Sequence, residues 1–159
     1  MAVLRERIDT RLGIDQAFAF VADFGNAERW DPGVASSVRL DPGPVRVGSR
    51  YRLGIRMGGR IAPMVYEISR LEPPHRVVLA GRGSGVTAVD DITFRATPKG
   101  TEIDYVADIR LEGAMRLLAP FAGGAFRGIA ERARDGMERA LDGLAAAAGT
   151  GAVLATGAR

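Results

Sequence analysis

The side chains best suited to chemistry in this chain are one acid, Asp90, and the three tyrosines, Tyr51, Tyr66 and Tyr105. Side chains alternate between the two faces of an extended segment, and all four of these residues fall on the face that carries the apolar side chains. A carboxylate there is costly unless it is hydrogen-bonded or its pKa rises, so an acid among phenols is a candidate site. These groups could orient a ligand's hydroxyl or carbonyl, or move a proton in an aldol-type cyclisation or dehydration. Asp90, Tyr66 and Tyr105 are therefore the candidate catalytic residues.

A structural interpretation of the same residues stays open. Asp90 could lie near a strand bulge, bonded to a tyrosine or turned to solvent, while the tyrosines only pack in the core. Because a slip of one residue exchanges the two faces of a strand, Asp91 is the alternative acid.

Other reactive groups have less support. The lone His75 follows a Pro-Pro pair in a turn with no nucleophile near it, so it is expected to be a surface residue. No cluster of histidines and carboxylates has metal-ligand spacing, and there is no cysteine, so neither a metal nor a cofactor is expected. The glycine-rich stretch 81–85 joins two strands and opens no helix, which excludes a phosphate-binding loop.

Extended segments separated by short Gly- and Pro-rich loops must position these side chains. Loops this short join antiparallel neighbours. One face of each segment is apolar and the other is charged, as Tyr51 and Leu53 against Arg50, Arg52 and Arg56 illustrate. The pattern predicts a seven-stranded antiparallel sheet with strands at 3–9, 34–40, 46–57, 61–72, 76–82, 86–96 and 101–111.

Helices are expected on the apolar side of this sheet. Residues 15–24 are alanine-rich and lack the polar alternation of a half-exposed strand, which predicts a short buried helix. Asn26 can cap a second helical turn through Trp30. The pattern of residues 120–148 predicts a long amphipathic helix with small residues on its inner stripe. We expect one domain over residues 1–148 and a flexible tail over 149–159, which is small, glycine-rich and without period.

Small residues on the inner stripe of the helix predict an apolar cavity between helix and sheet. Its mouth is expected where the Gly58-Gly59 hairpin meets the weak helix start at Pro120. Trp30 either closes one end of the cavity or plugs the core, and the methionines either suit a promiscuous pocket or fill core gaps. The predicted ligand-binding residues are Trp30, Tyr51, Leu53, Met57, Met64, Tyr66, Asp90, Ile92, Tyr105, Phe121, Ala125, Phe126 and Ile129.

Composition bounds the class of protein. The chain has 159 residues, of which 47% are hydrophobic and 26% charged, values typical of an ordinary globular protein. A net charge of +3 with arginines spread along the chain gives little support to nucleic-acid binding. No apolar run is long enough for a transmembrane segment or a signal peptide, so a cytoplasmic protein is expected.

The order of these elements resembles the helix-grip fold of the START-related superfamily, SRPBCC. The resemblance covers about residues 2 to 148, and its specific marks lie in 17–23, 30–32, 72–74, 91–94, 100–101 and 107–113. Together these marks resemble the bacterial branch labelled polyketide cyclase/dehydrase. The resemblance implies an α+β domain whose sheet wraps around the C-terminal helix and encloses a cavity for lipids, sterols, polyketides or similar molecules.

Two functions follow as expectations. The first is binding of a small hydrophobic or amphipathic ligand, such as a lipid, polyketide, quinone or sterol-like molecule, by a monomer or homodimer. The alternative is a polyketide aromatase/cyclase or dehydratase that uses the acid and the tyrosines of the cavity. A weaker third expectation is an accessory protein that acts through its long helix or its arginine face.

Overall fold

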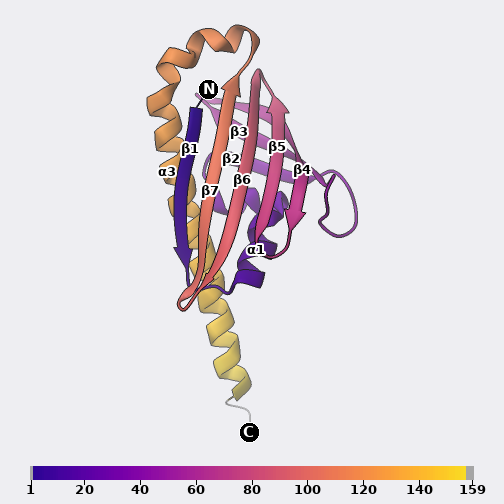
Figure 1. Cartoon of the computed structure of the whole chain (residues 1–159), viewed down its shortest axis with the longest axis vertical. Coiled ribbons are helices and arrows are strands. Elements are labelled where there is room, and N and C mark those ends of the chain that lie inside the picture. The colour runs from indigo at the N-terminus through magenta and orange to yellow at the C-terminus, as the bar shows by residue number, and fades with distance from the viewer. Residues whose placement is uncertain (1, 157–159) are drawn as a thin grey trace.

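The computed structural model describes residues 2–156 and contains one curved antiparallel sheet with helices on its concave side (Figure 1). The sheet has seven strands in the order β1-β7-β6-β5-β4-β3-β2. Consecutive strands from β2 to β7 are neighbours, and β1 pairs with β7 at the far edge. The strands are β1 (Ala2–Thr10), β2 (Val34–Arg39), β3 (Arg50–Met57), β4 (Arg60–Glu72), β5 (Arg76–Gly83), β6 (Val86–Thr97) and β7 (Gly100–Leu111).

Short helical segments follow β1, as the sequence predicts. They are α1 (Ile14–Ala22), the 3₁₀ turn η1 (Phe24–Asn26) and α2 (Ala27–Trp30). Asn26 precedes α2, but its side chain does not cap the helix and instead donates from Nδ2 to the Phe20 carbonyl at 3.0 Å. The buried side of α1 packs under the sheet, where the rings of Phe18 and Phe94 meet edge to face at 5.1 Å.

The long helix α3 (Ala119–Thr156) follows a second 3₁₀ segment, η2 (Gly113–Leu118). It passes along the β1 edge of the sheet and beyond the end of the strands (Figure 1). The predicted helix-grip arrangement is confirmed, with two differences in length. The helix continues through residues 149–156, which were predicted to be tail, and residues 157–159 lie outside the described part of the chain.

The strand β3 is shorter than predicted because residues 46–49 belong to a structured turn. Gly48 adopts a left-handed conformation with φ of 91°, and the Asp41 carboxylate accepts from the Arg50 amide at 2.6 Å. The Ser49 hydroxyl, which is fully buried, accepts from the Arg46 amide at 3.0 Å. These local bonds satisfy backbone groups that a longer strand would have paired with its neighbour.

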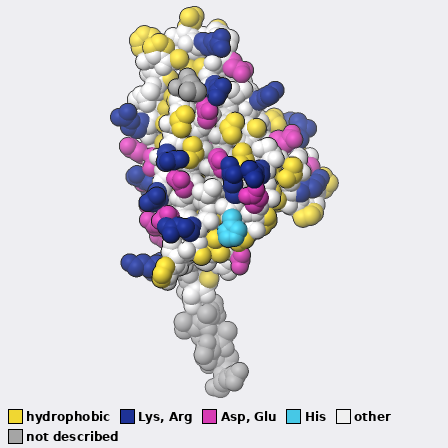
Figure 2. All heavy atoms as spheres, viewed as in Figure 1, with side chains coloured by type: hydrophobic (Ala, Val, Ile, Leu, Met, Phe, Trp, Pro, Cys, Tyr) yellow, Lys and Arg dark blue, Asp and Glu magenta, His cyan; other side chains and the backbone are white. Residues whose placement is uncertain are grey.

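The two faces of the sheet are sorted as the alternation predicts. The convex face carries arginines interleaved with acids (Figure 2), including the pairs Arg95–Glu102 at 2.8 Å and Arg76–Asp91 at 2.7 Å. His75, the one histidine, lies exposed on the surface of the turn before β5. The concave face carries the apolar residues. They form the core together with α1, α2 and the second half of α3, which contributes the buried side chains of Met137 and Leu141.

Candidate functional site

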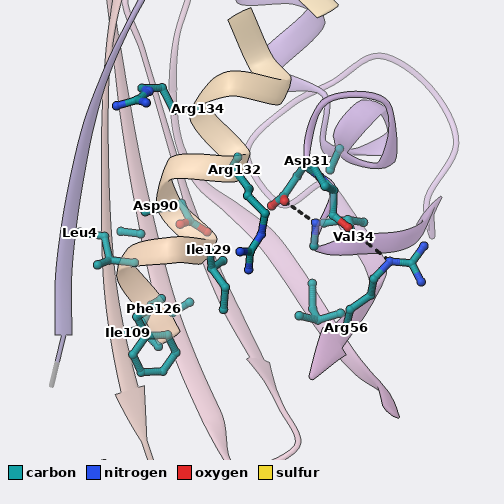
Figure 3. Close-up of a pocket in the computed structure, with 18 of the residues that line it drawn as sticks. Leu4, Asp31, Val34, Arg56, Asp90, Ile109, Phe126, Ile129, Arg132 and Arg134 are labelled. Carbon is teal, nitrogen blue, oxygen red and sulfur yellow. Dashed lines mark hydrogen bonds between the residues drawn. The ribbon is translucent and has the colours of Figure 1, made fainter. Parts of the chain in front are cut away.

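A pocket of about 700 Å³ lies between the concave face of the sheet and the first half of α3 (Figure 3). This volume is within the range of about 300–1,000 Å³ that is typical of small-molecule sites. It exists because α3 packs along β1 and α2, while most of the sheet beyond β7 stays away from the helix. None of residues 119–130 is buried, which shows how little of the helix fills this space.

The wall of the pocket is mainly apolar. The sheet contributes side chains from β1, β3, β4, β6 and β7, and the helix contributes mostly small residues. Apolar lining residues include Leu4, Ile8, Leu53, Met57, Met64, Ala88, Ala107, Ile109, Ala125, Phe126, Ile129 and Met137. A wall of this kind favours a ligand with a large apolar surface.

The polar groups on the sheet side of this wall are the predicted candidates. Asp90 on β6 is 5% exposed, and Tyr66 on β4 is 8% exposed. Tyr105 on β7 is only partly buried and also lines the pocket. Asp90 pairs with Ala107, which is two residues from Tyr105 on the same face of β7. Tyr66 pairs with Gly81, and Gly81 pairs with Ala88, two residues before Asp90. The register therefore brings these side chains to one region of the concave face. Asp91, the alternative acid, is instead paired with Arg76 on the convex face.

Burial dominates the electrostatics of this group. Removal from water raises the pKa of Asp90 to about 7, and the adjacent Tyr105 hydroxyl partly offsets this rise while the Asp31 carboxylate adds to it. Burial also holds the pKa of Tyr66 and of Tyr105 well above the ordinary value, with the Asp90 charge as the next cause. Both phenols therefore stay protonated near neutral pH, and Asp90 is poised between its two protonation states.

A second polar region lies on the helix side of the pocket, and the sequence analysis missed it. Asp31 follows α2 and accepts from the Gly33 amide at 2.7 Å. Burial is the largest cause that raises the pKa of Asp31, and the charge of Arg132 on α3 opposes it. Figure 3 shows the Arg132 side chain extending between Ile129 and Asp31. Position 132 is three residues after Ile129, a spacing that would have placed it beside the pocket stripe.

Arg56 also reaches this region, although the alternation along β3 placed it on the convex face. Its Nε donates to the Pro32 carbonyl at 3.3 Å, which holds the side chain beside the loop after α2 at the rim of the pocket, with the guanidinium group directed away from Ile129 and Arg132 (Figure 3). Arg134 and Glu6 line the other side and form an ion pair at 3.3 Å between α3 and β1. Side chains this long can cross a sheet edge, which an analysis of strand parity does not anticipate.

Ten of the predicted ligand-binding residues line the pocket. They are Trp30, Leu53, Met57, Met64, Tyr66, Asp90, Tyr105, Ala125, Phe126 and Ile129. Gly58 of the hairpin and Ala122 and Gly124 near the start of α3 line it as well, at the place predicted for its mouth.

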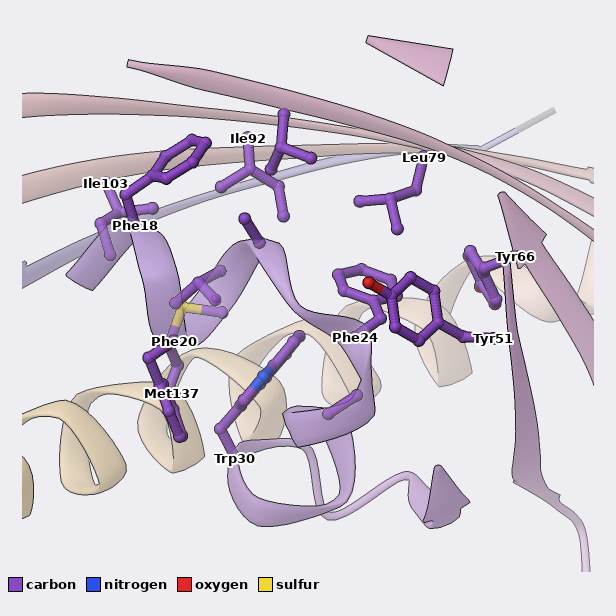
Figure 4. Packing of buried hydrophobic residues seen from close by; sticks show 14 of the residues in the cluster. Phe18, Phe20, Phe24, Trp30, Tyr51, Tyr66, Leu79, Ile92, Ile103 and Met137 are labelled. Carbon is purple, nitrogen blue, oxygen red and sulfur yellow. The ribbon is translucent and has the colours of Figure 1, made fainter. Parts of the chain in front are cut away.

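Three predicted residues lie elsewhere. Phe121 is 83% exposed, because the pocket stripe of α3 runs through Ala122, Phe126 and Ile129, and Phe121 lies one position, or about 100°, around the helix. Tyr51 and Ile92 point inward as predicted, but both are fully buried in the core rather than on the pocket wall (Figure 4).

Trp30 combines both roles that the sequence left open. It lines the pocket and is also buried in the core at 4% exposure. Its ring meets Tyr105 at 6.1 Å and Phe24 at 6.0 Å between centroids, both edge to face. The indole therefore fixes the position of α2 against the sheet while one side forms part of the wall.

Residues 2–156 contain no group of three or more His, Asp or Glu side chains placed to hold a metal ion. In the same part of the chain, no helix is long and apolar enough to cross a bilayer.

Sheet, long helix and apolar pocket together define a helix-grip domain of the START-like class. The family described as "Polyketide cyclase / dehydrase and lipid transport" matches residues 1–149, and the chain belongs to this family. The predicted resemblance is thereby confirmed. No curated protein matches this chain.

Solved structures share the fold at low identity. A protein from Thermus thermophilus is 15% identical with a TM-score of 0.74, covering 91% of this chain and 99% of its own. The Zhui aromatase/cyclase from a Streptomyces species is 15% identical with a TM-score of 0.71, covering 91% and 93%. A START superfamily protein from Mycobacterium smegmatis is 13% identical with a TM-score of 0.68, covering 89% and 94%. At these identities the likeness concerns the fold alone.

Proposed function

We propose that this protein binds a small hydrophobic or amphipathic molecule in the pocket between the sheet and α3. The observation that carries the proposal is an apolar pocket of about 700 Å³ with a few polar groups at defined places. Each 100 Å² of apolar ligand surface removed from water contributes about 2.5 kcal/mol. Asp90, Tyr66 and Tyr105 can then orient a hydroxyl or carbonyl group of the ligand. Lipids, polyketides, quinones and sterol-like molecules have this chemistry.

Mass spectrometry of an organic extract, with thermal-shift screening of those four classes, tests the proposal. We expect either a co-purified apolar molecule or a rise in melting temperature with at least one class. Ala88→Leu adds bulk at a buried pocket position and should reduce the shift. Ala96→Leu, at an exposed position of the same strand, should leave it unchanged. An empty protein that responds to no member of the panel would contradict ligand binding.

A second function, catalysis of an aldol-type cyclisation or dehydration, is supported by the poised carboxyl group of Asp90. As a base, the Asp90 carboxylate would take a proton from a carbon between two carbonyl groups. The new carbanion would attack the carbon of another carbonyl group, and a tyrosine hydroxyl would donate to the oxygen of that group as negative charge develops on it. The high pKa of the tyrosine keeps it protonated for that role. The family description and the aromatase/cyclase with the same fold are consistent with this chemistry.

Asp90→Asn separates catalysis from binding. With a poly-β-keto substrate, the variant should lose turnover while its thermal shift with that substrate stays nearly intact, because the amide keeps the shape but cannot accept the proton. An unchanged rate would remove Asp90 from the mechanism.

A further inference from the structure

Three large apolar side chains are exposed together at one end of the molecule. Leu117, Leu118 and Phe121 are 79%, 52% and 83% exposed. They lie in η2 and the first turn of α3, where the chain reverses between β7 and the long helix (Figure 1). Apolar residues exposed singly are common on protein surfaces, but a contiguous group beside a pocket marks an interaction site.

This apolar patch adjoins the pocket. Ala122 and Phe126, on the same stretch of helix, line the pocket, as do Met57 and Gly58 of the β3–β4 hairpin. The β5–β6 turn joins them, since the Ser84 hydroxyl donates to the Pro63 carbonyl at 3.2 Å and the Glu112 amide donates to the Gly85 carbonyl at 2.7 Å. We call the surface formed by residues 56–61, 82–86 and 111–127 the mouth end.

The mouth end is strongly basic. All of its arginines are exposed, and Glu112 is its one acid. Within residues 2–156, no ion pair involves any of these arginines, whereas all the other arginines of the sheet except Arg50 and Arg52 are paired with acids. The arginines of the mouth end are Arg56, Arg60, Arg82, Arg116 and Arg127.

An apolar patch surrounded by unpaired cations is complementary to an anionic lipid bilayer. The bilayer offers acyl chains to the leucine and phenylalanine side chains, and it offers phosphate groups to the guanidinium groups. A symmetric dimer through the same face would bring two sets of arginines together with only Glu112 to balance each set. The charge distribution therefore favours a membrane surface over a second copy of this chain.

We propose that the mouth end docks on anionic bilayers, with Leu117, Leu118 and Phe121 inserted at the headgroup boundary. The pocket then opens toward the lipid, so that an apolar molecule passes between bilayer and protein without crossing water. This inference goes beyond the proposed ligand binding and is tested without any ligand, so either can fail alone.

Co-sedimentation of the full chain with vesicles tests the docking. We expect binding to vesicles of phosphatidylcholine with phosphatidylglycerol, weaker binding to phosphatidylcholine alone, and a decrease as salt is raised. Leu117→Ser with Phe121→Ser should weaken partitioning at least about tenfold. Arg116→Gln with Arg127→Gln should weaken it about tenfold or more on the anionic vesicles only.

The chain offers a matched control in Val38 and Val47, which are 54% and 57% exposed and lie outside the mouth end. Val38→Ser with Val47→Ser should leave partitioning unchanged. A Phe121→Trp variant gives a second readout, since the indole at this exposed position should shift its emission to shorter wavelength with anionic vesicles.

The proposal would be overturned if the wild type did not bind anionic vesicles. It would also be overturned if Val38→Ser with Val47→Ser weakened binding as much as Leu117→Ser with Phe121→Ser, or if the latter variant bound as well as the wild type. A dimer in light scattering that the apolar double variant dissolves, without vesicle binding, would assign the patch to a second copy.

Discussion

Gly136 of α3 lies directly against the backbone of Trp30 at the end of α2. A Cβ atom at position 136 would collide with the Trp30 carbonyl oxygen and come within 3.1 Å of the Pro32 Cδ atom. The absence of a side chain at this one position lets the long helix rest on the helical segment that carries Trp30. The contact sets where α3 crosses the sheet and therefore where the pocket lies.

Gly136→Ala is expected to destabilise the protein by about 2 kcal/mol, because the collision involves backbone that cannot move aside easily. Gly143 provides the control, since a Cβ there meets nothing within 4 Å. Gly143→Ala should stabilise the protein by about 0.5–1 kcal/mol through helix propensity. Urea unfolding measures both changes, and a stabilised Gly136→Ala variant would contradict the close contact.

Asp90→Asn should change how stability depends on pH. The pKa of Asp90 is raised from 3.8 to about 7 in the folded state, so the folded protein binds this proton more tightly than the unfolded chain. The resulting stability is fully present below about pH 4 and is lost as pH rises through about 7. Near pH 8, Asp90→Asn is therefore expected to be more stable than the wild type by about 1–3 kcal/mol.

Urea unfolding across this pH range measures the effect. Asp91→Asn is the control, because Asp91 is on the convex face and its replacement only breaks the pair with Arg76. It should give no gain in stability at high pH. Since burial also raises the pKa of Asp31 and of Glu138, a smaller slope is expected to remain in Asp90→Asn and to decrease further when Asp31→Asn is added. An unchanged slope in Asp90→Asn would contradict the burial of a protonated carboxyl group.

Two buried hydroxyl groups should respond in opposite ways to removal. Within residues 2–156, the buried Tyr51 hydroxyl makes no hydrogen bond of normal geometry, so Tyr51→Phe should be neutral or stabilise the protein by about 1 kcal/mol. The Thr101 hydroxyl donates to the Leu12 carbonyl at 2.7 Å, so Thr101→Val should destabilise it by about 1–2 kcal/mol. Thermal unfolding of the two variants measures the difference. Equal destabilisation would show that Tyr51 has a partner in solution.

Gly81 and Tyr66 should be coupled in stability. The Tyr66 ring covers Gly81 on the neighbouring strand, and a Cβ at position 81 would lie 2.6 Å from ring carbons. Gly81→Ala should therefore destabilise the wild type and cost less in a Tyr66→Leu background, with a coupling energy of about 1 kcal/mol. A double-mutant cycle measures this value, and strictly additive effects would contradict the stacking. The same ring forms part of the pocket wall, so Gly81→Ala should also alter ligand binding.

Alternation along the strands was enough to predict the faces of the sheet. Asp90 and Tyr66 point to the concave side because each strand has one apolar face that must be buried, and this leaves a single register for the side chains. The short glycine- and proline-rich loops between the extended segments likewise predicted the hairpins. The amphipathic period predicted the long helix and its inner stripe, although its end was placed too early.

The tertiary structure alone decided which inward residues border the pocket and which fill the core. Tyr51 and Phe121 were assigned to the pocket, yet Tyr51 packs beside Phe24 and Phe121 faces outward. Their places depend on where α3 crosses the sheet, which its packing on β1 and the contact of Gly136 with Trp30 determine together. Periodicity within one element specifies its buried side. It carries no information about the angle and height at which two elements far apart in the chain meet.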